Sequence, residues 1–343
     1  MNDSRGPRSV LVGVIVLAFL IVPLGGQEGF RFRSGVDLVN VTATVTDRSR
    51  RFVADLSQSD FSVYDDDERV DVTYFSADRA PVSLGIVLDT SGSMEGEKIT
   101  NARGAIERFL DRLADPNDQV FLMGFSGDPV LIQDWTTARS ELKERLGRIQ
   151  PSGGTSMYDA VLEAVPLAQA GRNWKKAIII ISDGNDSTSR AHAADVQQAI
   201  RESDVMVYAV GIDGNAESTV RLQPPTPTWA PLLIPLSIPG PGRSRWPVLP
   251  QLVSFPGRNA NSERLNVSAL RGITDSSGGR TEVVRSARDL DRATESIAEE
   301  LSKQYYLGYA SPRERDDRWH SIRVEVRDRS LRVRARRGYV ATS

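Results

Sequence analysis

Apolar residues in this chain of 343 residues gather in four short, uninterrupted runs, separated by segments in which apolar positions recur with a helical period. Runs without alternation are typical of strands that are buried on both faces, as in a parallel sheet covered by helices. The predicted strands are Leu84–Leu88, Val120–Phe125, Ala177–Ile181 and Val205–Val210.

Helices are predicted between these strands. Apolar residues recur at helical spacing from Ile99 to Leu113, and the turn Asp115–Asp118 ends that segment. Further helices are predicted at Ser140–Ile149, Ser156–Ala170, Ala191–Ser203 and Ala287–Lys303. The run Val130–Trp135 follows a tight turn and predicts an antiparallel edge strand. This alternation predicts a doubly wound, mostly parallel α/β sheet, in which ligands bind at the carboxyl ends of the strands.

Strand-like alternation also occurs on both sides of this region. The expected strands are Val36–Val45, Phe61–Tyr64, Val70–Tyr74, Tyr305–Tyr309, Trp319–Val326 and Leu331–Arg336. Neither group has enough strands or apolar area for comfortable independent stability, so we expect both ends of the chain to build one small flanking β-sandwich. The last strand pair carries arginines on one face, which we interpret as a solvated face, with contact to an anionic surface as the alternative. These are Arg327, Arg329, Arg332, Arg334, Arg336 and Arg337.

The N-terminal residues have the pattern of a targeting segment. Arg5 and Arg8 precede the apolar run Val10–Leu24, and small residues near Gly26 suit signal peptidase. Residues 1–26 are therefore predicted to be a signal peptide, with an uncleaved N-terminal anchor as the alternative. The absence of cysteine excludes lipoprotein processing and disulfides, which fits an exported bacterial envelope protein.

Composition excludes some partners and marks one insertion. With 43 Lys and Arg against 45 Asp and Glu, the net charge gives no reason to expect nucleic acid or a membrane surface as the main partner. Ten of the 18 prolines lie in residues 223–257, which predicts an irregular insertion, either a packed loop or a lid or partner-binding arm. The expected domains are an N-terminal β segment (27–80), an α/β domain (81–303) and a C-terminal β segment (304–343).

Carboxylate and hydroxyl side chains follow two of the predicted strands. Asp89, Ser91 and Ser93 stand in a glycine-containing turn, Asp183 ends the third apolar run, and Thr155 lies in a Gly-Gly-Thr-Ser segment. Together they supply five oxygen ligands, which suits the all-oxygen, octahedral sites of Mg²⁺ and Mn²⁺. Taken alone, the first three residues fit a capped turn equally well, because such turns prefer the same residue types.

In these residues the chain resembles the von Willebrand factor type A domain, whose metal-ion-dependent adhesion site has the pattern Asp-x-Ser-x-Ser, then Thr, then Asp. All five positions are matched, by Asp89, Ser91, Ser93, Thr155 and Asp183. The resemblance covers roughly Pro81 to Leu301 and implies a Rossmann-like fold. It also implies a divalent cation with an open coordination position, which a carboxylate of a protein partner completes. More loosely, the whole chain resembles exported bacterial proteins related to this domain.

These observations predict an exported, non-enzymatic protein that binds a protein partner through its Asp or Glu, in adhesion or complex assembly. We expect Mg²⁺ or Mn²⁺ at the site, with Ca²⁺ fitting less well. The expected location is periplasmic, cell-envelope or secreted, with membrane contact only through an uncleaved anchor. Two alternatives are a metal-assisted hydrolase and a structural envelope protein with a vestigial metal site.

A Ser-His-Asp triad is not predicted. The only two histidines, His192 and His320, both follow Ser156 in the chain, which is not the order of a subtilisin-like protease. Neither histidine has Cys or carboxylate partners at ligand spacing in the sequence, so we interpret both as structural residues.

Overall fold

The computed structural model describes residues 38–113, 115–213, 265–313 and 315–341, all of which fall in one compact unit. The predicted signal peptide (1–26) and the proline-rich insertion (223–257) lie outside the described residues, so both stay predictions. None of the helices in the described ranges has the length and apolar character needed to cross a bilayer.

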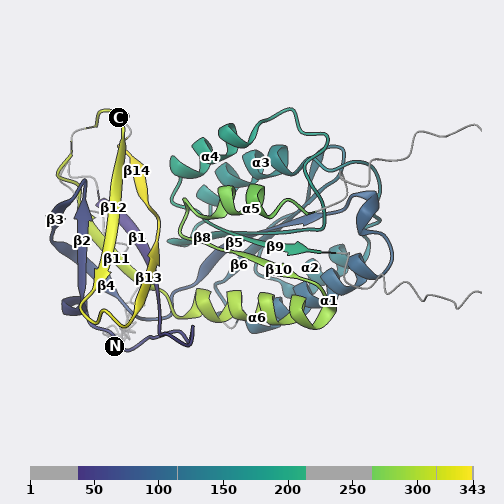
Figure 1. Cartoon of the computed structure of the whole chain (residues 1–343). Coiled ribbons are helices and arrows are strands. Elements are labelled where there is room, and N and C mark those ends of the chain that lie inside the picture. The colour runs from purple at the N-terminus through teal and green to yellow at the C-terminus, as the bar shows by residue number, and fades with distance from the viewer. Residues whose placement is uncertain (1–37, 114, 214–264, 314, 342–343) are drawn as a thin grey trace, which may run out of the picture. The chain divides into compact units, whose positions relative to one another are not determined.

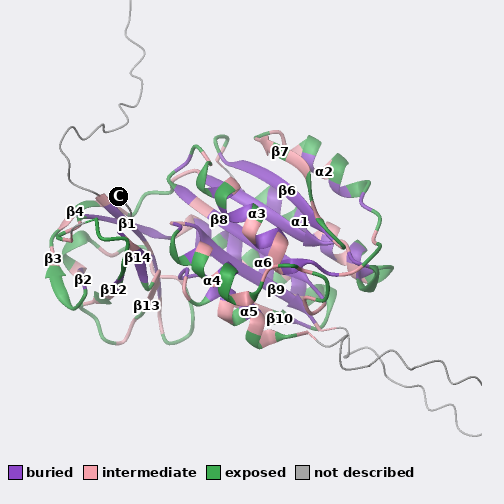
Figure 2. Ribbon diagram, turned by 90° about the horizontal axis from the view of Figure 1, so that it is seen from above, coloured by how far each residue is buried: buried purple, intermediate pink, exposed green. Residues whose placement is uncertain are grey.

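A six-stranded sheet forms the centre of the α/β domain (Figure 1). Its strands, in spatial order, are β10 (Thr281–Val284), β9 (Met206–Ile212), β8 (Lys175–Ser182), β5 (Val82–Asp89), β6 (Gln119–Phe125) and β7 (Pro129–Thr136). All neighbours pair in parallel except β7, which is antiparallel to β6. Every residue of β5, β6 and β9 is buried, as their uninterrupted apolar runs predict (Figure 2). The predicted sheet and its antiparallel edge strand are confirmed.

Helices cover both faces of the sheet, and each face has its own apolar core. On one face lie α1 (Glu97–Arg112), α2 (Arg139–Gly147) and α6 (Ala287–Ser302). On the other lie α3 (Met157–Gln169), α4 (Ala193–Arg201) and α5 (Val267–Thr274), as Figure 1 shows. The sequence did not predict α5 or β10. These elements have eight and four residues, and segments of that length are too short for a helical or strand period to be recognised.

The two ends of the chain build one β-sandwich, as predicted. One sheet has the order β13 (Arg332–Ala335), β1 (Leu38–Thr46), β11 (Tyr305–Ala310) and β4 (Val72–Ser76). The other has the order β14 (Gly338–Val340), β12 (Trp319–Val326), β2 (Phe61–Asp65) and β3 (Glu68–Val70). Strands from both ends of the chain share a single apolar core, so neither end forms a sandwich without the other.

The single strand predicted at Val70–Tyr74 is wrong. The segment divides at Asp71 into the end of β3 and the start of β4, which belong to different sheets. Asp66 and Asp67 have φ angles of 46° and 64° and turn the chain into a hairpin, so β3 pairs with β2. β4 then pairs with β11 in the opposite sheet. The alternation of apolar and polar residues continues across Asp71, because both short strands keep one face toward the core of the sandwich.

A buried acid connects the sandwich with the α/β domain. Glu300 of α6 is fully buried and accepts hydrogen bonds from the Thr44 hydroxyl of β1 (3.0 Å) and the Tyr208 hydroxyl of β9 (2.9 Å). It also forms ion pairs with Arg280 (3.2 Å) and with Arg334 of β13. The interpretation of the C-terminal arginines as one solvated face is therefore wrong for Arg334, and it is also wrong for Arg336, which is half-buried with its Nε atom enclosed. Sequence alternation cannot show that a buried carboxylate lies opposite this strand.

Candidate metal site

The loops that follow β5 and β8 lie side by side, because parallel neighbours end at the same edge of a sheet. Asp89 is the last residue of β5, and Asp183 follows the last residue of β8. The Ser182 hydroxyl donates a hydrogen bond to Asp89 Oδ2 (2.5 Å), which joins the two strand ends directly. Both carboxylates therefore lie at the carboxyl ends of the strands, where α/β sheets of this kind bind ligands.

Four of the five predicted residues form a continuous chain of hydrogen bonds. The Ser91 N–H donates to Asp89 Oδ1 (2.9 Å), and the Ser91 and Ser93 hydroxyl oxygens are 3.0 Å apart. The Ser93 hydroxyl donates to Asp183 Oδ1 (2.8 Å). These contacts bring the two carboxylates and two hydroxyls to one place.

Thr155 reaches the same place from the loop that precedes α3. A Cβ atom added at Gly184 would lie 3.7 Å from Thr155 Oγ1 and 3.9 Å from Ser93 Oγ. The two hydroxyls therefore face a space that the missing side chain of Gly184 leaves open. The structure thus brings all five predicted residues together.

Backbone hydrogen bonds between the loops fix this arrangement. They run from Gly92 N–H to the Gly153 carbonyl (3.1 Å), from Ser152 N–H to the Thr90 carbonyl (2.8 Å), and from Ser187 N–H to the Thr155 carbonyl (2.8 Å). Gly153 has a φ of 80°, a conformation that only glycine adopts without strain. The five residues are therefore held in place by loops that are bonded to one another.

The electrostatics of the site favour a cation. Burial, together with the nearby charge of Asp183, raises the pKa of Asp89 to about 6, although hydrogen bonds from Ser182 and Ser91 act in the opposite direction. Two carboxylates that repel each other, surrounded by neutral hydroxyls, match the oxygen donors that Mg²⁺ and Mn²⁺ prefer. The residues present therefore fit such an ion.

Lys98 is a residue of this site that sequence reasoning missed. It lies in the first turn of α1, where its ammonium group forms an ion pair with Asp183 and donates to the Ser93 carbonyl (3.1 Å). Asp183 has only 1% of its side chain exposed, whereas Lys98 has 34%. Its position in the sequence, five residues after Ser93, could have indicated that its side chain lies over the turn that contains Ser93.

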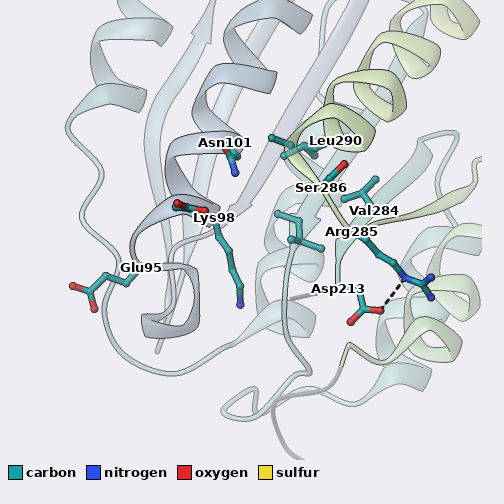
Figure 3. Close-up of a pocket in the computed structure, with 11 residues that line it drawn as sticks. Glu95, Lys98, Asn101, Asp213, Val284, Arg285, Ser286 and Leu290 are labelled. Carbon is teal, nitrogen blue, oxygen red and sulfur yellow. Dashed lines mark hydrogen bonds and ion pairs between the residues drawn. The ribbon is translucent and has the colours of Figure 1, made fainter. Parts of the chain in front are cut away.

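A hollow of about 270 Å³ opens beside Lys98 (Figure 3). Apolar side chains that line it include Val284 and Leu290, and Lys98 extends toward it from α1. On the far side Arg285 pairs with Asp213 (3.4 Å). The metal site is thus bordered by a concave surface that combines apolar and charged groups.

His320 belongs to a separate cluster in the sandwich, and the expectation that it lacks carboxylate partners is wrong. Its Nδ1 lies 2.7 Å from Asp66 and its Nε2 3.0 Å from Asp316. Asp65, Asp66 and His320 could place ligand atoms within 4.8 Å of one another. However, the Arg313 guanidinium pairs with both Asp65 (3.2 Å) and Asp66 (3.7 Å), and both nitrogens of His320 already face carboxylates. We therefore interpret this cluster as a structural ion-pair network.

We expect the His320 network to make stability depend on pH. Burial alone would lower the pKa of His320, but its hydrogen bonds to Asp66 and Asp316 outweigh burial and raise it. The resulting stabilisation is complete below the unfolded-state value of about 6.5 and is lost as pH rises through the raised pKa. His320→Gln should therefore reduce the free energy of unfolding in urea by about 1 kcal/mol at pH 5.5 and by less at pH 9.

His192→Gln provides the matched control, because His192 is exposed at the start of α4. It should leave the free energy of unfolding unchanged at both pH values. An equal loss for His320→Gln at pH 5.5 and pH 9 would show that the charge of His320 is not the cause.

Part of this chain is similar to known proteins. Residues 83–223 match the family model of the von Willebrand factor type A domain. Bovine (Bos taurus) inter-alpha-trypsin inhibitor heavy chain H4 is 32% identical over 147 residues, which is 38% of this chain and 16% of that protein. The human protein of the same name is 30% identical over 135 residues, or 36% of this chain and 14% of the relative. The chain thus matches only a small part of these relatives' length.

Solved structures with a similar chain path include a von Willebrand factor type A protein from Catenulispora acidiphila. It has a TM-score of 0.46 and 14% identity, with 89% of this chain and 72% of that chain covered. The protein BatB from Bacteroides thetaiotaomicron has a TM-score of 0.45 and 22% identity, with 65% and 98% covered. On the strength of the family match and of the α/β fold described above, the chain contains a von Willebrand factor type A domain.

Proposed function

We propose that this protein is an exported, non-enzymatic binding protein that captures a protein partner through a divalent cation. Asp89, Ser91, Ser93, Thr155 and Asp183 would hold Mg²⁺ or Mn²⁺. The observation that carries the proposal is that loops bonded to one another gather two carboxylates and three hydroxyls at the strand ends. Export is supported by Arg5, Arg8 and the apolar run that follows them.

The donor set explains how a partner would be held. A cation at this site supplies an electrophilic position to which a partner's Asp or Glu carboxylate can bind. Ser91, Ser93 and Thr155 contribute neutral oxygens, so the two carboxylates leave the site without excess negative charge. Gly184 keeps the space beside Thr155 and Ser93 free of a side chain. These residues would orient the cation and balance its charge, and none of them needs to act as a nucleophile.

The experiment that tests this function is capture of partners from bacterial envelope extract with Mg²⁺ or with EDTA. Capture by the wild-type protein should require Mg²⁺, and Thr155→Ala should weaken it at least about tenfold, since one ligand of the cation is lost. Thr137→Ala is the matched control, because Thr137 is exposed and follows β7, outside the site. Capture that persists in EDTA and in Thr155→Ala would overturn the proposal and favour binding through the sandwich.

We expect Lys98 to weaken cation binding. Its ammonium group is paired with Asp183, so a divalent cation must compete with it for the same carboxylate. Lys98→Met should therefore raise the affinity for Mn²⁺ about tenfold, which corresponds to about 1.4 kcal/mol. Titration calorimetry with MnCl₂ measures this change directly.

Lys143→Met is the control for Lys98→Met, because Lys143 also pairs with an aspartate, Asp111 (2.6 Å), on the helical surface. It changes the net charge equally and should leave Mn²⁺ affinity unaltered. An affinity that falls in Lys98→Met would mean that Lys98 supports the site and does not compete for it.

A further inference from the structure

A second concave surface lies between the edge strand β10 of the central sheet and the edge strand β13 of the sandwich, within the same compact unit. We call it the β10–β13 groove. Its volume of about 610 Å³ falls in the range of ligand-binding pockets. The five residues of the metal site do not line it. Any ligand of this groove would therefore bind independently of the cation.

The groove carries excess positive charge. Five arginines among the described residues line it, of which Arg280 and Arg334 both pair with the buried Glu300 and are neutralised by Glu300 and Glu282 together. The other three, Arg50, Arg271 and Arg332, are exposed, and their guanidinium groups have no acidic partner among the residues that the structure describes. Glu282, the one acidic residue among the described residues of the lining, is paired with Arg280 (2.9 Å). Three arginines are thus available to an anionic ligand.

Backbone groups are available in the same groove. Among the described residues β10 is the last strand of its sheet, and the carbonyls of Arg280 and Val284 accept hydrogen bonds from the N–H groups of Ala209 in β9 (3.0 Å) and of Asp213 just after β9 (2.8 Å). Because the pairing direction alternates along a strand, the N–H and C=O groups of Thr281 and Val283 point away from β9. Both residues line the groove, and Val283 is 37% exposed. Such an edge is a template for an added strand.

Arg50 adopts a backbone conformation that is unusual for a residue with a side chain. It has a φ of 63°, a left-handed conformation that costs a residue with a side chain some stability. It sits in a tight turn in which its own N–H donates to the Asp47 carbonyl (3.0 Å). Glycine would fit this position without strain, yet an arginine stands here and reaches the groove.

We propose that the β10–β13 groove binds an extended acidic peptide, which pairs as an added strand with the outer edge of β10 while its carboxylates meet Arg50, Arg271 and Arg332. The open backbone groups favour a peptide over other polyanions, since only a peptide backbone matches their spacing. The arginines select acidic side chains on the face of the added strand that meets them.

The probe that tests this is a fluorescein-labelled octapeptide of alternating Glu and Val with blocked ends, measured by fluorescence anisotropy with the full chain in EDTA. Its glutamates share one face when the peptide is extended. The peptide should bind, whereas the Gln–Val peptide and an analogue N-methylated at alternate residues should not. Binding in EDTA separates this proposal from the proposed metal-dependent function, so that either can fail alone.

Variants locate the site. Arg271→Gln with Arg332→Gln should weaken binding of the Glu–Val peptide by about tenfold or more, because both charge-assisted contacts are lost. Arg145→Gln with Arg288→Gln removes the same charge from exposed arginines outside the groove and should not weaken it. Arg50→Gly removes the third guanidinium in a conformation that glycine tolerates, so this variant should fold normally and still bind more weakly.

Several outcomes would overturn the proposal. The first is that the Glu–Val peptide does not bind at low salt. The second is that both double variants weaken its binding equally. The third is that the N-methylated analogue binds as well as the Glu–Val peptide. Retention of phosphatidylglycerol vesicles or heparin without retention of the peptide would assign the groove to a different class of ligand, in which the edge of β10 has no part.

Discussion

Addition of millimolar MgCl₂ or MnCl₂ should raise the melting temperature of the purified protein, and Ser93→Ala should abolish the rise. A ligand that binds only the folded state stabilises it by about 2.7 kcal/mol at a hundredfold excess over its dissociation constant. Ser93 links the Ser91 hydroxyl to Asp183 and offers its own oxygen to the cation, so its loss removes one ligand and one positioning contact. Differential scanning fluorimetry across a metal series measures the effect.

Two controls accompany this prediction, namely the substitution of a distant serine and a change of pH. Ser140→Ala changes an exposed residue of α2 and should keep the full metal response. Because the pKa of Asp89 is raised to about 6, protons should compete with the cation, and the response should shrink as pH falls below that value. A melting temperature that is the same with and without metal at pH 7.5 would contradict an intact site.

Removal of the buried acid at the domain junction should be the most destabilising single change considered for this protein. Glu300→Ala leaves Arg334 without its counter-charge and Arg280 with Glu282 alone, and it removes the carboxylate that accepts from the Thr44 and Tyr208 hydroxyls. Breaking a buried ion pair from one side typically costs about 3–5 kcal/mol. Urea unfolding followed by fluorescence and by circular dichroism should show this loss.

Glu299→Ala is the matched control, since Glu299 is the preceding residue of the same helix and has 48% of its side chain exposed. Its pair with Lys303 on the surface contributes little to stability. Equal free energies of unfolding for the two variants would show that the Glu300 network does not hold the sandwich to the α/β domain.

The sequence by itself predicted five of the six strands of the central sheet, most of the covering helices and the five residues that we propose as the metal site. Strands buried on both faces must be apolar throughout, so β5, β6, β8 and β9 stand out as uninterrupted runs. Because parallel strands end at the same edge, residues that follow two such runs meet without any knowledge of side-chain contacts. Asp89 and Asp183 are 94 positions apart in the chain, yet this rule was enough to bring them together.

Only the tertiary structure decided which charged groups meet across the fold. The ion pair of Lys98 with Asp183, the contact of Asp66 with His320, and the pairing of Arg334 with Glu300 join segments whose separation in sequence carries no periodic signal. It also divided Val70–Tyr74 between two sheets and placed β10 at an open edge. Local patterns report whether a position is buried, whereas the partner of a buried or half-buried charge depends on how distant elements pack, which no local pattern records.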